Sequence, residues 1–212
     1  MKELYLNDVI KDRPIEDTRY ILKKFYDDAY SSGIYKPGCG KITWEHIAGK
    51  VNAEVFEINK CLDVGCGTGT GIKYAREQGW NVFGCDIADI SMHWKKNNVE
   101  DYCTVASAMD LPYKDEEFDF VMCNDVLEHI HEDDILLTLK EIFRICKRLV
   151  FLSICLVHEW HPVKGFIFSH ICLKPVDWWI QKILKAGFTD LRPWNGEHHL
   201  TVWGYRPRKE EA

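Results

Sequence analysis

A run of alternating glycines constrains this chain more than any other feature. The stretch from Lys60 to Gly71 reads Lys-Cys-Leu-Asp-Val-Gly-Cys-Gly-Thr-Gly-Thr-Gly, a short apolar strand followed by glycine at four alternate positions. Glycine lets the backbone turn tightly and approach a ligand, because no Cβ stands in the way. A helical segment, residues 72–78, follows directly, and the free N–H groups of its first turn can face a polar ligand. The stretch therefore predicts a strand, a ligand-binding loop and a helix.

The spacing of these glycines excludes two common nucleotide-binding loops. A dinucleotide fingerprint requires Gly-x-Gly-x-x-Gly or Ala. The frames that start at Gly65, Gly67 and Gly69 end instead on threonine, isoleucine and tyrosine. The phosphate loop Gly-x-x-x-x-Gly-Lys of nucleotide hydrolases also finds no match. What remains is Asp-x-Gly-x-Gly-x-Gly, starting at Asp63, with a ligand-free glycine turn as the alternative.

With this motif the sequence resembles the class I S-adenosylmethionine-dependent methyltransferases, and within them the ubiquinone-pathway-like O-methyltransferases. The resemblance covers about residues 55–205. It implies an α/β fold: a Rossmann-like, doubly wound, seven-stranded and mostly parallel sheet with an antiparallel last strand, helices on both faces and an N-terminal helical cap. It implies S-adenosylmethionine as cofactor and S-adenosylhomocysteine as product, with Asp63 near the methionine end.

An acid follows the second predicted strand. Asp86 ends the strand 81–86 and stands 21 residues beyond Gly65, where an acid holds a ribose through its hydroxyl groups. The alternative role for Asp86 is to cap a helix predicted over residues 87–97.

The third strand, predicted over residues 101–108, leads into Met109, Asp110 and a proline. The resemblance places Met109 against the adenine ring and Asp110 near the exocyclic amine, while an acid beside a proline also suits a structural turn. We predict that the cofactor is bound by Asp63, Gly65, Cys66, Gly67, Gly69, Asp86, Ile87, Ala108, Met109, Asp110, Asn124 and Asp125.

After the fourth strand, 118–124, the sequence reads Asp-Val-Leu-Glu-His-Ile. Asp125 and Glu128 have capping-box spacing and predict a helix start. In the family this segment lines the side where the methyl group leaves, so His129 is the first candidate base, since imidazole titrates near neutral pH. In some quinone-pathway O-methyltransferases a similar run is associated with a divalent metal. We predict no metal here, because two acids and a histidine on one turn are not specific.

Residues 157–174 interrupt the pattern between a fifth strand, 147–156, and a helix that starts at Pro175 and ends at Gly187. The family usually has a Lys-Pro-Gly-Gly turn before this fifth strand, and here glycine and proline are missing. Loops at the carboxyl ends of parallel strands carry substrate sites, so we expect this insertion to bind the methyl acceptor. An ordered hairpin with surface histidines is the alternative. The candidate bases here are His158, Glu159, His161 and His170, and the last two strands are predicted over 188–194 and 198–205.

The chain before the first strand is predicted to be helical. Apolar periodicity indicates a helix from Pro14 to Ser31 and a shorter one around residues 43–51. We divide the chain into a cap or lid, residues 1–54, and a methyltransferase core, residues 55–212. Four aromatic residues serve either as a lid or as packing: Tyr26, Tyr30, Tyr35 and Trp44.

The composition of the chain limits which binding partners we expect. With a net charge of −6, the 212-residue chain does not favour a duplex nucleic acid. The nine cysteines include no Cys-x-x-Cys pair, and the sequence shows no signal peptide and no apolar run of membrane-spanning length. We therefore expect reduced cysteines and a cytoplasmic protein. We also expect a monomer or homodimer. We expect transfer of a methyl group to an oxygen or nitrogen of a small molecule. The alternatives are a non-catalytic subunit that binds S-adenosylmethionine, or an aminopropyl transferase; the failed glycine spacing disfavours an oxidoreductase.

Overall fold

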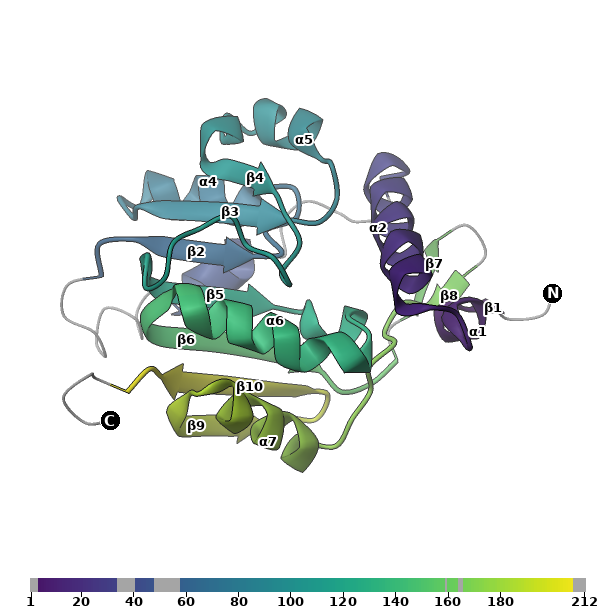
Figure 1. The fold of residues 1–212 in the computed structure, drawn as a ribbon. Coiled ribbons are helices and arrows are strands. Elements are labelled where there is room, and N and C mark those ends of the chain that lie inside the picture. Colours follow the sequence, from purple (N-terminus) through teal and green to yellow (C-terminus); the bar gives the residue numbers. More distant parts are fainter. Residues whose placement is uncertain (1–3, 34–40, 48–57, 159, 164–165, 208–212) are drawn as a thin grey trace.

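A seven-stranded sheet forms the centre of the structure, a computed structural model that describes residues 4–33, 41–47, 58–158, 160–163 and 166–207 (Figure 1). The strand order is β4-β3-β2-β5-β6-β10-β9. From β4 to β6 all neighbours are parallel, and β10 is antiparallel to both of its neighbours. This is the predicted mixed sheet. Its strands are β2 (Cys61–Val64), β3 (Val82–Asp86), β4 (Cys103–Val105), β5 (Phe118–Asn124), β6 (Cys146–Cys155), β9 (Thr189–Asn195) and β10 (His199–Tyr205).

The strand order reverses beside β2. The chain runs outward from β2 to β3 and β4, then returns to the other side of β2 with β5 and continues to β6. At such a switch point the connections leave the sheet in opposite directions, which opens a crevice at the carboxyl ends of the strands. The predicted glycine loop, 65–69, lies at this point.

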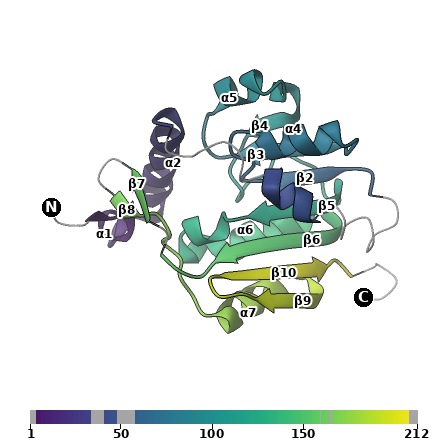
Figure 2. The ribbon, with the colours of Figure 1, turned by 180° about the vertical axis from the view of Figure 1, so that it is seen from behind.

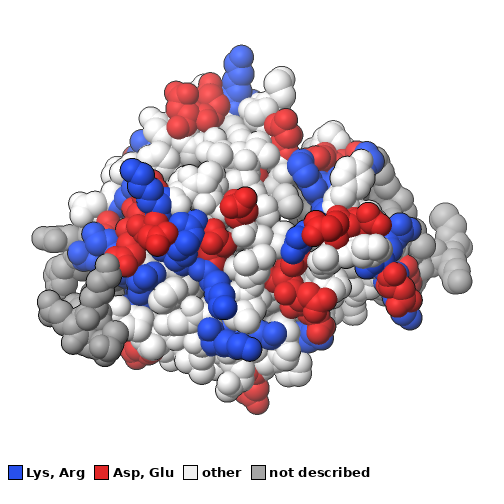
Figure 3. All heavy atoms as spheres, viewed as in Figure 1, with Lys and Arg blue, Asp and Glu red and all other residues white. Residues whose placement is uncertain are grey.

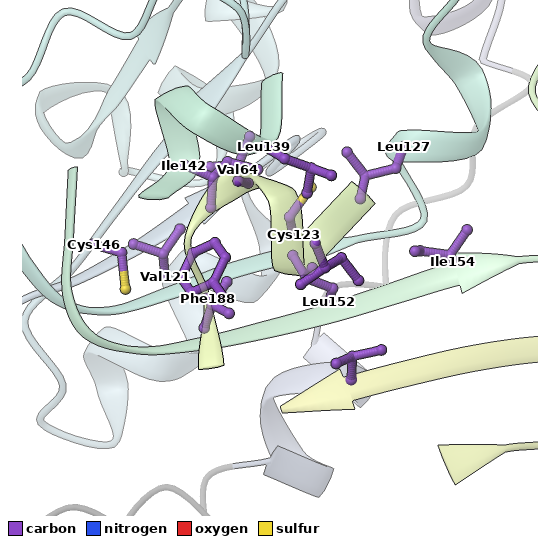
Figure 4. Packing of buried hydrophobic residues seen from close by; sticks show 14 of the residues in the cluster. Val64, Val121, Cys123, Leu127, Leu139, Ile142, Cys146, Leu152, Ile154 and Phe188 are labelled. Atoms are coloured by element: carbon purple, nitrogen blue, oxygen red, sulfur yellow. The ribbon is translucent and has the colours of Figure 1, made fainter. Parts of the chain in front are cut away.

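Each face of the sheet is covered by its own hydrophobic cluster, because successive side chains of a strand point to opposite faces. Alternate residues such as Val121 and Cys123 pack with α6 (Glu132–Ile145) and α7 (Val176–Ala186), as Figure 4 shows. The intervening Phe120 and Met122 pack on the other face. Helices there are residues 41–47, α4 (Thr70–Glu77) and α5 (Ser91–Lys96).

The missing glycine and proline before the fifth strand have a structural substitute. Helix α6 ends at Ile145 and β6 begins at Cys146, with no loop between them. The Nη1 of Arg206 donates to the carbonyl oxygens of Phe143 and Cys146, at 2.5 and 3.2 Å. A basic side chain can satisfy the last carbonyls of a helix, so this arginine does what a glycine turn does elsewhere.

The N-terminal segment and the insertion together build a second, smaller sheet. β1 (Leu4–Tyr5) pairs with β8 (Phe166–Phe168), which pairs with β7 (Trp160–Val163). Figures 1 and 2 show this sheet and α1 (Leu6–Ile10) beside α2 (Ile15–Ser31), away from the core helices. The insertion thus contains the ordered hairpin that we considered as the alternative.

Several element boundaries differ from the predictions. The third strand is only Cys103–Val105, after a 3-10 turn, and the helix predicted from residue 87 starts at Ser91. The capping box at 125 and 128 is wrong. A positive φ of 53° at Asp125 turns the chain into a 3-10 turn, Leu127–His129, and helix α6 starts later. Its cap is His131, whose side chain accepts a hydrogen bond from the Asp133 N–H.

No helix in the described part of the chain combines the length and the apolar composition needed to cross a bilayer. On the face drawn in Figure 3, basic and acidic side chains are interspersed.

Candidate active site

A cavity opens at the switch point, between the sheet and helix α2 of the cap. It is lined from four parts of the chain: the ends of β2, β3 and β5 with the turns after them, the loop after β4, the start of α6, and one side of α2. It thus joins segments that are far apart in the sequence. The main lining residues are Arg19, Leu22, Tyr26, Tyr30, Val64, Gly65, Cys85, Asp86, Ile87, Ala106, Ser107, Ala108, Met109, Asp125, Val126, His129, Ile130 and Asp134.

Asp86 sits at the end of β3 with its carboxylate fixed. Oδ2 accepts a hydrogen bond from the Gly67 N–H at 2.9 Å, and Oδ1 accepts one from the Ala88 N–H at 3.0 Å. The carboxylate therefore orients the glycine loop and the turn after β3, not the first turn of α5. Burial raises the pKa of Asp86 to about 6, which leaves the group ionised at neutral pH.

The glycine loop adopts conformations that favour glycine. Gly65 has a φ of +80°, and a Cβ there would lie 2.2 Å from a methyl carbon of Val126. Gly67 has a φ of +52°, and a Cβ there would lie 3.0 Å from the hydroxyl of Tyr30 on α2. Since Gly65 is close to the turn after β5 and Gly67 is close to the cap, a side chain fits poorly at either position. These residues provide the kind of groove in which a nucleoside cofactor can lie against the main chain.

Asp63 lies behind this loop. Its side chain is almost fully buried, and Oδ2 accepts a hydrogen bond from the indole N–H of Trp44 at 3.1 Å. Burial raises the pKa of Asp63 to about 7. Trp44 is itself completely buried and therefore packs beneath the loop, whereas Tyr26 and Tyr30 line the cavity. Tyr35 lies outside the described residues.

We expect Asp63→Asn to stabilise the cofactor-free chain above pH 7 and to weaken cofactor binding. The folded state holds the proton of Asp63 up to a pKa of about 7, and the unfolded chain only up to about 4. The native state therefore binds more protons between these values, so wild-type stability falls as the pH rises through this window. Urea unfolding at pH 5 and pH 8 measures the effect. Equal pH dependence in the two proteins would contradict it.

An ion pair joins the cap to the core at the rim of the cavity. The guanidinium of Arg19 on α2 binds both carboxylate oxygens of Asp134 on α6, at 2.6 and 3.0 Å. Asp134 is only 4% exposed, and the guanidinium is partly exposed. A bidentate pair with a buried carboxylate fixes orientation as well as distance. The pair holds α2 over the loop that carries Gly67.

We expect Arg19→Ala to loosen the cap. The substitution leaves a buried carboxylate without its cation, which should lower stability by about 1–2 kcal/mol and raise hydrogen exchange in α2. Lys24→Ala is the matched control, because the Lys24–Asp28 pair on the same helix is long, 3.8 Å, and exposed. Equal exchange in the two variants would show that the pair does not hold the cap.

Asp125 lies between this cavity and a second one. Its carboxylate accepts hydrogen bonds from Asn124 Nδ2 at 3.0 Å and from the Ser153 hydroxyl at 3.2 Å, and His199 Nε2 lies 3.7 Å away. The second cavity is rich in histidine. Its lining is Asp125, Glu128, Cys155, Val157, His158, His198 and His199.

The three predicted catalytic histidines occupy different positions. His129 lines the first cavity, beneath the ring of Tyr26. His158 is exposed and lines the second cavity. His170 is 2% exposed and lines neither, but its ring lies 4.7 Å from that of His129. Glu159 and the side chain of His161 lie outside the described residues.

The structure brings together only part of the predicted cofactor set. Gly65, Asp86, Ile87, Ala108, Met109 and Asp125 line the first cavity. Cys66, Gly67, Gly69, Asp63 and Asn124 lie in the loop or strand ends beside it. Asp110 is exposed and does not line the cavity. Sequence reasoning missed Arg19 and His199, because neither lies in a recognisable motif. It considered Glu128 only as a helix cap and as part of a metal-binding run.

The sheet is parallel at its switch point, where the glycine turn lies, and a buried acid ends the next strand. This arrangement is typical of α/β proteins that bind a nucleoside cofactor. Comparison with known families agrees with this. Residues 62–154 match the methyltransferase domain family. This match supports the class I S-adenosylmethionine-dependent methyltransferase domain that the sequence predicts, a class whose cofactor is S-adenosylmethionine.

Solved structures share this fold at low sequence identity. The 1,6-didemethyltoxoflavin-N1-methyltransferase of Burkholderia thailandensis, solved with 1,6-didemethyltoxoflavin and S-adenosylhomocysteine, has a TM-score of 0.67 at 16% identity, over 91% of this chain and 90% of that one. Magnesium protoporphyrin IX methyltransferase of Synechocystis, with bound S-adenosylhomocysteine, has a TM-score of 0.66 at 16% identity, over 89% of this chain and all of that one.

A curated relative is closer in sequence but longer. An uncharacterized protein of Methanocaldococcus jannaschii is 33% identical over 109 residues. The match covers 51% of this chain and 45% of the relative, so the chain matches less than half of that protein's length.

Proposed function

We propose that this protein transfers the methyl group of S-adenosylmethionine to an oxygen or nitrogen of a small-molecule acceptor. One observation carries the proposal: a single cavity brings the glycine loop and Asp86 together with Asp125 and His129 beneath the cap. The first pair suits the nucleoside and the second pair faces the place where an acceptor would react. The bound cofactor would supply an activated methyl group on a sulfonium.

The residues of the chain have distinct roles in this proposal. Asp86 accepts the ribose hydroxyls, since a carboxylate offers about four acceptor sites, more than its main-chain hydrogen bonds occupy. Asp63 stabilises the charged methionine end. Ala108 and Met109 contact the adenine. His129 accepts the proton that the acceptor loses, and Asp125 orients the acceptor at the boundary between the two cavities.

Residues 1–54 and the insertion 157–174 act as a cap in this proposal. Helix α2 already covers the cavity through Tyr26, Tyr30 and the Arg19–Asp134 pair. Excluding water and aligning the acceptor with the methyl group provide much of the catalysis for a donor that is already activated. The small sheet formed by β1, β7 and β8 keeps the two cap segments together.

The acceptor is a small molecule in this proposal. The second cavity adjoins the first at Asp125 and offers imidazole and carboxylate groups to a polar compound. The mixed charge of the face in Figure 3 does not favour a polyphosphate. The N1-methyltransferase of Burkholderia thailandensis, which has the same fold, was solved with 1,6-didemethyltoxoflavin and S-adenosylhomocysteine bound.

Calorimetry with S-adenosylhomocysteine and a methylation assay over a panel of phenols, amines and N-heterocycles test the proposal together. We expect binding, and product whose mass increases by one methyl group in the presence of an accepted compound. Binding without methylation of any compound would favour the non-catalytic subunit. Aminopropyl transfer from decarboxylated S-adenosylmethionine would favour an aminopropyl transferase. Absence of cofactor binding would refute the methyltransferase, the non-catalytic subunit and the aminopropyl transferase alike.

A further inference from the structure

Three side chains beside the proposed acceptor position form a group with metal-ligating chemistry. One oxygen of Glu128 and one ring nitrogen each of His129 and His170 all lie within 4.8 Å of one another. Glu128 and His129 belong to the turn after β5, whereas His170 follows the insertion hairpin, about 40 residues later. The tertiary fold, and not a local motif, therefore assembles this group.

One carboxylate oxygen of Glu128 lacks a hydrogen-bond partner in the part of the chain that the structure describes. Its side chain is completely buried, and Oε1 accepts a hydrogen bond from the Cys155 N–H at 2.9 Å. Oε2 is also buried and has no partner among the described residues. An unpaired buried carboxylate oxygen is costly unless a cation compensates it, so this oxygen is placed as a ligand would be.

Main-chain carbonyls set the orientation of both imidazoles. Nδ1 of His129 lies 3.2 Å from the carbonyl oxygen of Ser169, and Nδ1 of His170 lies 2.6 Å from that of Val157. A carbonyl oxygen only accepts hydrogen bonds, so each Nδ1 carries the proton. In a neutral ring the lone pair is then on Nε2. A hydrogen bond from one ring nitrogen to a carbonyl oxygen fixes the tautomer and orientation of a histidine that binds metal through the other nitrogen.

The backbone holds the two halves of the group together. The carbonyl oxygen of Glu128 accepts hydrogen bonds from the N–H groups of Ile171 and Cys172, both at 2.9 Å. His170 is thereby fixed next to the turn that carries Glu128 and His129. Ligand atoms about 2.1 Å from one ion lie no more than about 4.2 Å apart, so only a small closure of the side chains is needed.

We propose that Glu128, His129 and His170 bind one divalent transition-metal ion at the boundary of the two cavities. This proposal departs from our prediction of no metal, which treated the turn at 125–129 and the insertion separately. Two imidazoles with one carboxylate favour zinc, manganese, iron or cobalt over magnesium, which prefers oxygen ligands. Within the described residues three protein ligands leave coordination positions open, and the adjoining cavities give an acceptor access to them.

The role of the metal in catalysis rests on the proposed function, but the binding of the metal does not. A bound ion could orient an acceptor oxygen next to the methyl donor and stabilise it as an oxyanion. The Nε2 of His129 would then bind the ion, and the acceptor hydroxyl would release its proton to solvent instead of to His129. Metal-free and metal-loaded protein therefore distinguish a base at His129 from a metal-assisted reaction.

Cobalt and zinc binding test the site without any acceptor. The full chain, treated with chelator and dialysed, is titrated with Co²⁺ while the visible ligand-field absorption is followed, and with Zn²⁺ by calorimetry. We expect one ion per chain in the wild type, and affinity weakened at least about tenfold in Glu128→Gln and His170→Asn. In Glu128→Gln the amide oxygen can still accept the hydrogen bond from the Cys155 N–H, so this variant tests the ligand even if His170→Asn does not fold.

His93→Asn, on α5 and outside the group, is the matched control and should bind cobalt like the wild type. The inference is overturned if the wild type binds no ion, or if Glu128→Gln binds as tightly as the wild type. Binding of S-adenosylhomocysteine is measured on the same samples. Cofactor binding without metal binding refutes the site alone, whereas metal binding without cofactor binding refutes the proposed function alone.

Discussion

Replacing Asp86 with asparagine is expected to weaken the binding of S-adenosylhomocysteine by about 100-fold. The proposed ribose contact consists of two hydroxyl groups that donate to one carboxylate, and each hydrogen bond to a charged group contributes about 1.5 kcal/mol. Their loss amounts to about 3 kcal/mol, which corresponds to roughly a 100-fold change in the dissociation constant. Asparagine has nearly the same shape, but its Nδ2 accepts no hydrogen bond and its one neutral oxygen faces the main-chain N–H groups of Gly67 and Ala88, so neither charge-assisted ribose bond is kept. Calorimetry at pH 7.5 measures the change.

The pH dependence of binding provides an independent readout. The pKa of Asp86 is raised to about 6, so the carboxylate is ionised at pH 7.5 and becomes protonated as the pH falls through 6. Wild-type affinity should therefore decrease between pH 6.5 and pH 5. Asp63 is already protonated over most of this range. The decrease should be absent in Asp86→Asn.

Asp89→Asn is the matched control, because Asp89 lies three residues further on and is exposed. It should bind S-adenosylhomocysteine within about twofold of the wild type. Asparagine at position 86 also faces the N–H groups of Gly67 and Ala88 with one acceptor instead of two, so its unfolding curve must be recorded. An Asp86→Asn protein that folds and binds like the wild type would remove the ribose contact from the proposal.

The parallel part of the sheet could be predicted because its signals are local. The strands at 61–64 and 118–124 are apolar runs bounded by glycine or polar residues, and they appear at the predicted positions. The third strand could not be delimited in the same way. Only Cys103–Val105 pair with β3, since the chain before them forms a 3-10 turn.

The site was predictable where a ligand contacts the backbone and much less so where side chains meet across the fold. The glycine loop and Asp86 follow from spacing. The Arg19–Asp134 pair joins residues 115 positions apart, and His170 meets Glu128 only because a main-chain carbonyl fixes the segment after the insertion. Neither contact leaves a periodic or spaced pattern. The capping box failed for a related reason: Glu128 turns inward to bind the Cys155 N–H.

Replacing Gly65 with alanine is expected to destabilise the protein by about 2–4 kcal/mol. The new Cβ would lie 2.2 Å from a methyl carbon of Val126, far inside the 3.5–4.0 Å at which carbon atoms attract each other. Overpacking of this kind lowers stability by about 1–3 kcal/mol. A non-glycine residue at a φ of +80° adds about 1 kcal/mol or more. Urea unfolding measures the sum.

Two further variants separate the steric contribution from the backbone contribution. Gly79 has a φ of +88°, and a Cβ there would meet no atom within 4 Å, so Gly79→Ala should show the backbone contribution alone, about 1 kcal/mol. Removing the obstructing methyl groups by Val126→Ala should restore about 2 kcal/mol to Gly65→Ala, beyond the effect of Val126→Ala by itself. If Gly65→Ala is no less stable than Gly79→Ala, the loop does not lie against the turn after β5. The groove proposed for the cofactor would then have to be placed elsewhere.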